Sequence, residues 1–104
     1  RYGLPVLTVV LDNGGWNATK RNVERLHPEG AAVRADRYWV NLEQSADFGG
    51  IASAAGQAWS ATVTRIEELD GALREGLAQV TAGTPAVVTV RVAAITAQNN
   101  AAAL

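Results

Sequence analysis

The clearest hydrophobic pattern in the chain is an apolar and β-branched run from Val6 to Leu11. Such a run suits a strand buried on both faces of a parallel sheet better than an alternating edge strand. It ends at Asp12-Asn13-Gly14-Gly15, and open α/β sheets bind ligands at the carboxyl ends of their strands. Asn-Gly and Gly-Gly are also ordinary hairpin turns, but residues 16–21 lack the second strand that a hairpin needs. The pattern therefore predicts a ligand loop on a central strand.

The segment that follows, residues 17–45, has only weak periodicity. We expect one short helical turn over residues 22–26, ended by His27-Pro28, and a solvated surface for most of the charged side chains. Tyr38-Trp39-Val40 is unusually apolar for such a surface, so we expect it to pack against the domain or a partner subunit. Residues 45–55 predict a helix ended by Gly56, with one apolar face made of Phe48, Ile51, Ala52 and Ala55.

The last third of the chain has the clearest secondary-structure signals. Residues 58–63 predict a short strand, and Thr64-Arg65-Ile66-Glu67 has the pattern of a capping box. The helix after it is expected to end at Gly83, and its buried stripe comprises Ile66, Leu69, Leu73, Leu77 and Val80. Residues 86–92 predict another strand. The order β-loop-α-β-α-β predicts an α/β fold with a doubly wound, mostly parallel sheet and helices on both faces.

Composition narrows the function classes. The 104 residues are 48% hydrophobic and 18% charged, which suits one globular domain or part of one. A net charge of -1 gives no general attraction to nucleic acid or an anionic membrane, and no apolar run is long enough to span a bilayer. The absence of cysteine fits a reducing cytoplasm, where we expect the protein. The single histidine, His27, excludes a multi-histidine metal site within one chain, and its place before a proline favours a surface position over an acid-base role.

The residues Val9 to Trp16 resemble the second half of the thiamine diphosphate motif, in which an Asn pair ends a hydrophobic strand. The features downstream match as well: the long loop, Asp47-Phe48 with its small-residue helix, the Glu67-Glu68-Leu69 helix and the strand after Thr84-Pro85. The chain to about residue 92 is therefore similar to the C-terminal part of a diphosphate-binding domain. The resemblance is closest to the branch of acetolactate synthase and benzoylformate decarboxylase, enzymes that act on 2-oxo acids. Residues 93–104 are expected to form a tail whose last residues resemble vector-encoded sequence.

The resemblance implies a set of cofactor contacts. It makes the Asn13 side chain and the Gly15 carbonyl ligands of Mg²⁺, which prefers such hard oxygen donors. It also places Gly14 and Trp16 at thiamine diphosphate, and Asn17 and Thr19 on the substrate side of the cofactor. From the residues alone, Asn17 and Thr19 are equally well explained as caps of the next turn.

The chain departs from the family pattern in two ways. Asp12 stands where the family usually has the first Asn, a position that is not the usual metal ligand. The Gly-Asp-Gly turn, whose aspartate is a principal ligand in the family, is absent from the sequence. The catalytic glutamate also comes from another domain in this family. We therefore expect no complete active site here, and we expect a pyrimidine-binding domain of the same or a neighbouring subunit as partner in a homo-oligomer.

Two functions of different classes remain open at this point. The first is part of a thiamine diphosphate- and magnesium-dependent lyase or transferase that decarboxylates or ligates 2-oxo acids. The second is a non-catalytic α/β nucleotide-binding or subunit-interaction module in which residues 13–15 are a plain turn. A dinucleotide-binding Rossmann half is disfavoured, because no G-x-G-x-x-G follows either strong strand.

Overall fold

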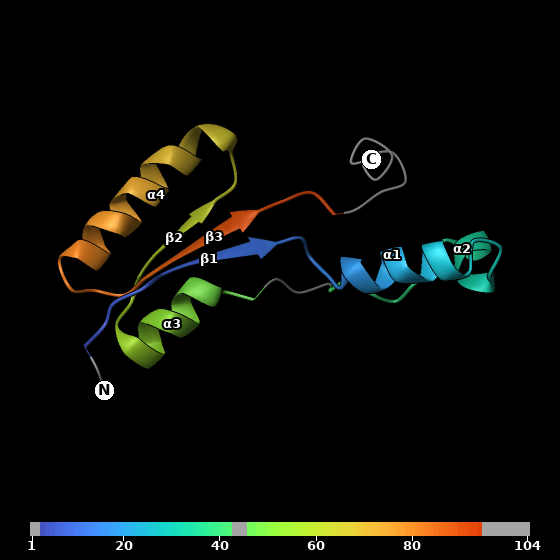
Figure 1. Cartoon of the computed structure of the whole chain (residues 1–104), viewed down its shortest axis with the longest axis horizontal. Helices are drawn as coiled ribbons and strands as arrows, with labels where there is room; N and C mark the ends of the chain where they lie inside the picture. Colours follow the sequence, from blue (N-terminus) through green and yellow to red (C-terminus); the bar gives the residue numbers. More distant parts are fainter. Residues whose placement is uncertain (1–2, 43–45, 95–104) are drawn as a thin grey trace. The chain divides into compact units, whose positions relative to one another are not determined.

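The computed structural model describes residues 3–42 and 46–94. Within them the elements are β1 (Leu7–Asp12), α1 (Asn17–Leu26), α2 (Ala31–Ala35), α3 (Phe48–Gly56), β2 (Trp59–Val63), α4 (Ile66–Thr81) and β3 (Ala86–Arg91) (Figure 1). The chain divides into two compact units. Of the described residues, the sheet unit comprises 3–12 and 46–92, and the loop-helix unit comprises 13–42 and 93–94.

The sheet unit is built on three parallel strands in the order β1-β3-β2. Val88 of β3 lies between Val9 of β1 and Ala61 of β2 in the register of the sheet. Because β3 has a strand on each side, it holds the most buried of the described hydrophobic residues, with Ala86 1% and Val88 0% exposed. The predicted α/β fold with a parallel sheet is therefore confirmed.

Helices cover both faces of this sheet, with α4 on one side and α3 on the other (Figure 1). Both approach closely through a glycine. A Cβ on Gly76 of α4 would lie 2.9 Å from Leu7 Cδ1 and 3.5 Å from Val88 Cγ2. On the opposite face, a Cβ on Gly49 of α3 would lie 2.7 Å from Ser60 Cβ. Side chains alternate across a strand, so Ser60 supplies the small residue that α3 needs.

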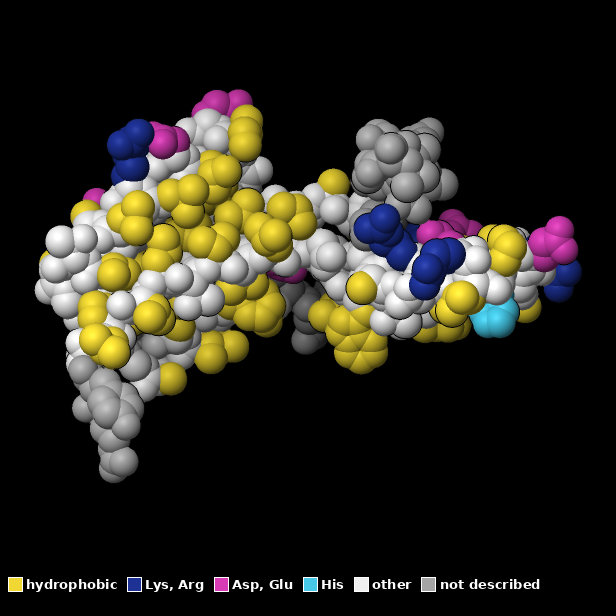
Figure 2. All heavy atoms as spheres, in the orientation of Figure 1, with side chains coloured by type: hydrophobic (Ala, Val, Ile, Leu, Met, Phe, Trp, Pro, Cys, Tyr) yellow, Lys and Arg dark blue, Asp and Glu magenta, His cyan; other side chains and the backbone are white. Residues whose placement is uncertain are grey.

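The position of β1 corrects one prediction. The apolar run was expected to form a central strand buried on both faces, but β1 is an edge strand of the described sheet, and β3 is the central one. Val9 is 45% and Leu11 68% exposed as a result. Figure 2 shows apolar side chains gathered over this part of the sheet unit. The hydrophobic content of a strand indicates a preference for burial, but it does not determine which strand of the sheet has a neighbour on each side.

The predicted apolar faces of both sheet-covering helices are correct only in part. In α3, Phe48 is 36% and Ile51 63% exposed, and Gly49 is the buried residue. In α4 the buried residue is Gly76, whereas Ile66 is 74% and Leu77 56% exposed. The other predicted members of the α4 stripe are half-buried: Leu69, Leu73 and Val80. The closest approach of helix and sheet selects the residue with no side chain, so each contact is centred on a glycine instead of on the large apolar residues.

The ends of the helices differ from the prediction by small shifts. The N-cap of α4 is Arg65, and the Glu68 carboxylate accepts hydrogen bonds from the backbone N–H groups of Arg65 and Thr64, both at 3.3 Å. The predicted box had Thr64 and Glu67 in these roles and was therefore displaced by one residue. Asp47 caps α3 itself, because its Oδ1 accepts from the Gly50 N–H at 2.8 Å.

The loop-helix unit has more regular structure than its sequence predicted. α1 begins at Asn17, five residues before the expected turn, and a second short helix, α2, follows it. His27 is exposed and ends α1, where its N–H donates to the Val23 carbonyl, which agrees with a surface position. In the apolar stretch after α2, Val40 is buried but Trp39 is 88% exposed, so only part of that stretch packs within the unit.

None of the described helices is long and apolar enough to cross a membrane. Gly3 has a positive φ (+60°), which glycine adopts without strain. Residues 1–2, residues 43–45 with the expected helix start at Ser45, and residues 95–104 of the expected tail 93–104 lie outside the described part of the chain.

Candidate functional site

The predicted ligand loop lies directly after the carboxyl end of β1. The last residue of that strand, Asp12, is held on both its side chain and its backbone. Its Oδ2 lies 3.3 Å from Nε of Arg91, and its carbonyl accepts from the Val92 N–H at 2.9 Å. Arg91 is also the last residue of the neighbouring parallel strand. The starting point of the loop is thus tied to the end of β3.

Hydrogen bonds within the loop set its shape. Gly14 has a φ of +71°, a conformation that glycine adopts without strain. The Asn13 Oδ1 accepts from the Gly15 N–H at 3.3 Å, which closes a turn of the Asx type. Asn17, only 2% exposed, donates from Nδ2 to the Asn13 carbonyl at 3.2 Å. The first residue of α1 therefore holds the loop backbone, a role that its sequence position did not reveal.

A distant segment supports the other end of the loop. Gly15 forms an antiparallel bridge with Asn41, made by Trp16 N–H to Val40 O at 2.9 Å and Leu42 N–H to Gly14 O at 2.8 Å. A Cβ on Gly15 would overlap the Val40 carbonyl oxygen and lie 3.1 Å from the Asn41 Cα. Gly15 is therefore required for this contact, quite apart from any approach to a phosphate. The apolar Val40 was the only sequence signal of the bridge.

The remaining predicted site residues lie at the start of α1. Trp16 is 65% exposed, and its carbonyl accepts from the N–H groups of Thr19 and Lys20 at 3.1 and 3.3 Å. The Thr19 side chain is exposed, whereas that of Asn17 is buried under the loop. The structure thus brings Asn13, Gly14, Gly15 and Trp16 together on one short segment.

Comparison with known protein families gives one match. Residues 1–90 match the family described as "Thiamine pyrophosphate enzyme, C-terminal TPP binding domain". The chain belongs to this family. A comparison with curated proteins finds no significant match. The loop after β1 is therefore part of a thiamine pyrophosphate-binding domain of the kind found in thiamine pyrophosphate enzymes.

The candidate metal ligands of this thiamine pyrophosphate-binding domain are oxygen atoms of the loop. Across residues 3–42 and 46–94, no three His, Cys, Asp or Glu side chains lie close enough to hold a metal ion. The loop offers neutral oxygens instead. An amide oxygen has two lone pairs, so Asn13 Oδ1 can accept from Gly15 and still bind a cation. The bridge uses Gly14 O and Trp16 N–H, which leaves the carbonyl of Gly15 outside it.

Proposed function

We propose that this chain anchors the diphosphate of thiamine diphosphate through Mg²⁺ in an enzyme that decarboxylates or ligates 2-oxo acids. The family match supports thiamine diphosphate as the cofactor, and the loop at the carboxyl end of a parallel strand supports the position of the site. Within the family we propose the branch that contains acetolactate synthase and benzoylformate decarboxylase. The sequence Asp12-Asn13-Gly14-Gly15-Trp16 and the helix that begins at Phe48 support this choice.

In this proposal Asn13 Oδ1 and the Gly15 carbonyl bind the metal, while Gly14 and Trp16 contact the cofactor. Both donors are hard oxygens of the type that Mg²⁺ accepts in its octahedron. The buried Asn17 amide and the bridge to Asn41 hold these donors before any ligand arrives. Such preorganisation lowers the ordering cost of binding. When bound, thiamine diphosphate supplies the electron sink for chemistry at the substrate carbonyl.

The proposal also requires partners. Two neutral oxygens compete poorly with water for Mg²⁺, which dehydrates reluctantly. An acidic ligand and the pyrimidine-binding side of the cofactor site must therefore come from elsewhere in the same or a neighbouring subunit, as in a homo-oligomer. Thr19 is exposed at the start of α1 and is proposed to face the substrate. Asn17 is proposed to act on the substrate side through the loop that it holds, since its own amide is buried.

The test is a calorimetric titration of the apoenzyme that contains this chain, prepared by removing the cofactor from the holoenzyme. Thiamine diphosphate is titrated into it with and without Mg²⁺. Asn13→Ala removes one metal ligand, and we expect it to weaken magnesium-dependent binding by about tenfold or more. Asn13→Asp keeps an oxygen that accepts from the Gly15 N–H and should retain binding. Asn22→Ala is the matched control, because Asn22 is exposed on α1.

Three outcomes would contradict this assignment. If Asn13→Ala binds the cofactor as tightly as the wild-type protein does, Asn13 is not a ligand. If Asn13→Ala and Asn22→Ala weaken binding equally, the effect is not specific to the loop. An enzyme that binds thiamine diphosphate equally well without any divalent cation would contradict the metal role altogether.

A further inference from the structure

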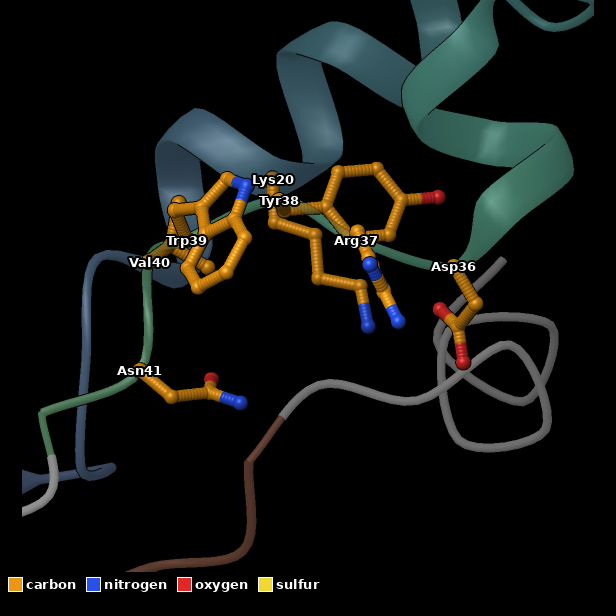
Figure 3. A pocket seen from close by; sticks show the side chains of 7 residues that line it. All are labelled: Lys20, Asp36, Arg37, Tyr38, Trp39, Val40 and Asn41. Atoms are coloured by element: carbon orange, nitrogen blue, oxygen red, sulfur yellow. The ribbon is translucent and has the colours of Figure 1, made fainter.

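A groove of about 500 Å³ lies in the loop-helix unit, and no part of the proposed cofactor role uses its side chains. Its lining comes from α1 and from the segment after α2: Lys20, Asp36, Arg37, Tyr38, Trp39, Val40 and Asn41. The volume lies within the range of sites for small molecules, about 300–1,000 Å³. Figure 3 shows Trp39 and Asp36 at opposite ends of the groove, with Lys20 and Arg37 between them.

Two cations in this groove have no carboxylate partner among the described residues. Neither Lys20 nor Arg37 forms an ion pair there, whereas Arg65, Arg74 and Arg91 each do. The Lys20 Nζ lies 4.9 Å from the centre of the Tyr38 ring, which steadies the ammonium group without neutralising it. In Figure 3 the ends of both cationic side chains point the same way, into the space beside Asn41. The middle of the groove therefore presents two cationic groups.

The tyrosine does not cancel that charge. Burial, together with the negative charge of Glu24 and its hydrogen bond with the phenol, raises the pKa of Tyr38 above its ordinary value. The phenol is accordingly neutral at physiological pH.

The exposed tryptophan is the third observation. Trp39 has a φ of +52°, in the left-handed region that bulky residues rarely adopt, and it is 88% exposed. Because the indole is exposed, no burial of its apolar surface offsets the cost of this backbone conformation. Backbone strain of this kind is concentrated where a protein binds ligands. The indole face at the end of the groove is a platform on which a flat ring can stack.

We propose that this groove binds a nucleoside monophosphate, with the phosphate between Lys20 and Arg37 and the base stacked on Trp39. A phosphate dianion matches two cations, whereas a carboxylate would leave one of them unpaired. Asp36 at the far end adds one negative charge, which repels a longer phosphate chain. The Asn41 amide faces the same space and can hydrogen-bond the sugar or the base. The proposal goes beyond the cofactor role and does not depend on it.

The test is calorimetric titration of AMP into the same holoenzyme, with adenosine, inorganic phosphate and benzoate as partial ligands. We expect AMP to bind at least about tenfold more tightly than any of the three, because each lacks the phosphate or the base. Lys20→Gln and Arg37→Gln should each weaken AMP binding by about tenfold. Arg34→Gln is the matched control, since Arg34 is an exposed arginine of α2 outside the groove, and AMP affinity should not change.

The role of the indole is tested separately. Trp39→Ala should weaken AMP binding by about fivefold or more, while Trp39→Phe keeps a ring and should retain most of the affinity. An amide NMR spectrum of each variant confirms that the unit is folded. If Trp39→Ala does not fold, the AMP affinity of Trp39→Phe is compared with the affinities of Lys20→Gln and Arg37→Gln, which are expected to be lower.

Three results would overturn the proposal. The first is no AMP binding up to about 1 mM, the range of weak specific ligands. The second is an AMP affinity that neither Arg37→Gln nor Trp39→Ala changes, and the third is benzoate or phosphate binding as tight as that of AMP. The titration is repeated on Asn13→Ala. Unchanged AMP binding in a variant that has lost the cofactor would show that the two sites are separate, so that either proposal can fail alone.

Discussion

Replacing Gly15 by alanine is the sharpest test of how the loop after β1 is held. The added Cβ would overlap the carbonyl oxygen of Val40 and lie 3.1 Å from the Asn41 Cα. Both neighbours are backbone atoms, so no side-chain rotation can relieve the contact. The bridge between the loop and residues 40–42 must therefore open, and with it the hydrogen bonds donated by the N–H groups of Trp16 and Leu42.

The expected magnitude follows from those two hydrogen bonds. Each contributes roughly 0.5–1.5 kcal/mol, so the bridge should lose about 1–3 kcal/mol of local stability, a factor of about 5–150 in its opening equilibrium. The effect is local because no other element contributes to this bridge. If the Gly15 carbonyl is a metal ligand, magnesium-dependent cofactor affinity falls by up to the same factor, since the open loop must be closed again on binding.

The assay is amide hydrogen exchange at Trp16 and Leu42, measured by NMR, with the core amides of β3 as an internal reference. The matched control is Gly14→Asn. Gly14 has a positive φ, but a Cβ there meets nothing within 4 Å, and asparagine tolerates the left-handed region. Protection at Trp16 and Leu42 should fall in Gly15→Ala and persist in Gly14→Asn. Unchanged protection in Gly15→Ala, or an equal loss in both variants, would refute the reasoning.

The same geometric reasoning predicts opposite outcomes for two helical glycines. Gly49→Ala should destabilise the fold by about 1–2 kcal/mol, because its Cβ would lie 2.7 Å from Ser60 Cβ. Gly71 has open space around it, so Gly71→Ala should stabilise the fold by about 0.5–1 kcal/mol. Denaturant unfolding measures both, and a Gly49→Ala protein that Ser60→Gly does not restore would contradict the stated cause. The raised pKa of Tyr38 favours the neutral phenol in the folded state, so its contribution to stability holds below pH about 10 and is lost as the pH rises through the folded-state pKa. Glu24→Gln should lower that pKa toward its ordinary value in a phenolate absorbance titration from which Tyr38→Phe is subtracted, and an unchanged curve would exclude Glu24 as a cause.

The local patterns of the sequence were enough for the order of the three strands and the two sheet-covering helices, for the parallel sheet and for the position of the loop. Apolar runs, the glycine at residue 83 and the acidic residues at helix starts act over a few positions, so they can be recognised without knowledge of the fold. The loop at residues 13–15 was found in this way. Its family resemblance was then borne out by the match of residues 1–90 to a thiamine pyrophosphate-binding domain.

Only the tertiary structure decided which surfaces meet. Periodicity favoured Leu77 and Ile51 as buried residues, but the contacts between helices and sheet are centred on Gly76 and Gly49. A hydrophobic side chain records a preference for burial, and whether a neighbour lies within reach depends on strands far along the chain. The same holds for β1, whose sequence is that of an interior strand although its place in the described sheet is at the edge.

The candidate site shows the same division. The sequence by itself determined that Asn13, Gly14 and Gly15 follow a strand and offer oxygen donors. It could not determine that Gly15 lies against Val40, that the Asn17 amide is buried beneath the loop, or that Lys20 shares a groove with Arg37. Two of these contacts join residues that are 17 to 25 positions apart, from Lys20 to Arg37 and from Gly15 to Val40. No local pattern encodes such a contact, because it depends on how two helices bring the chain back to the loop.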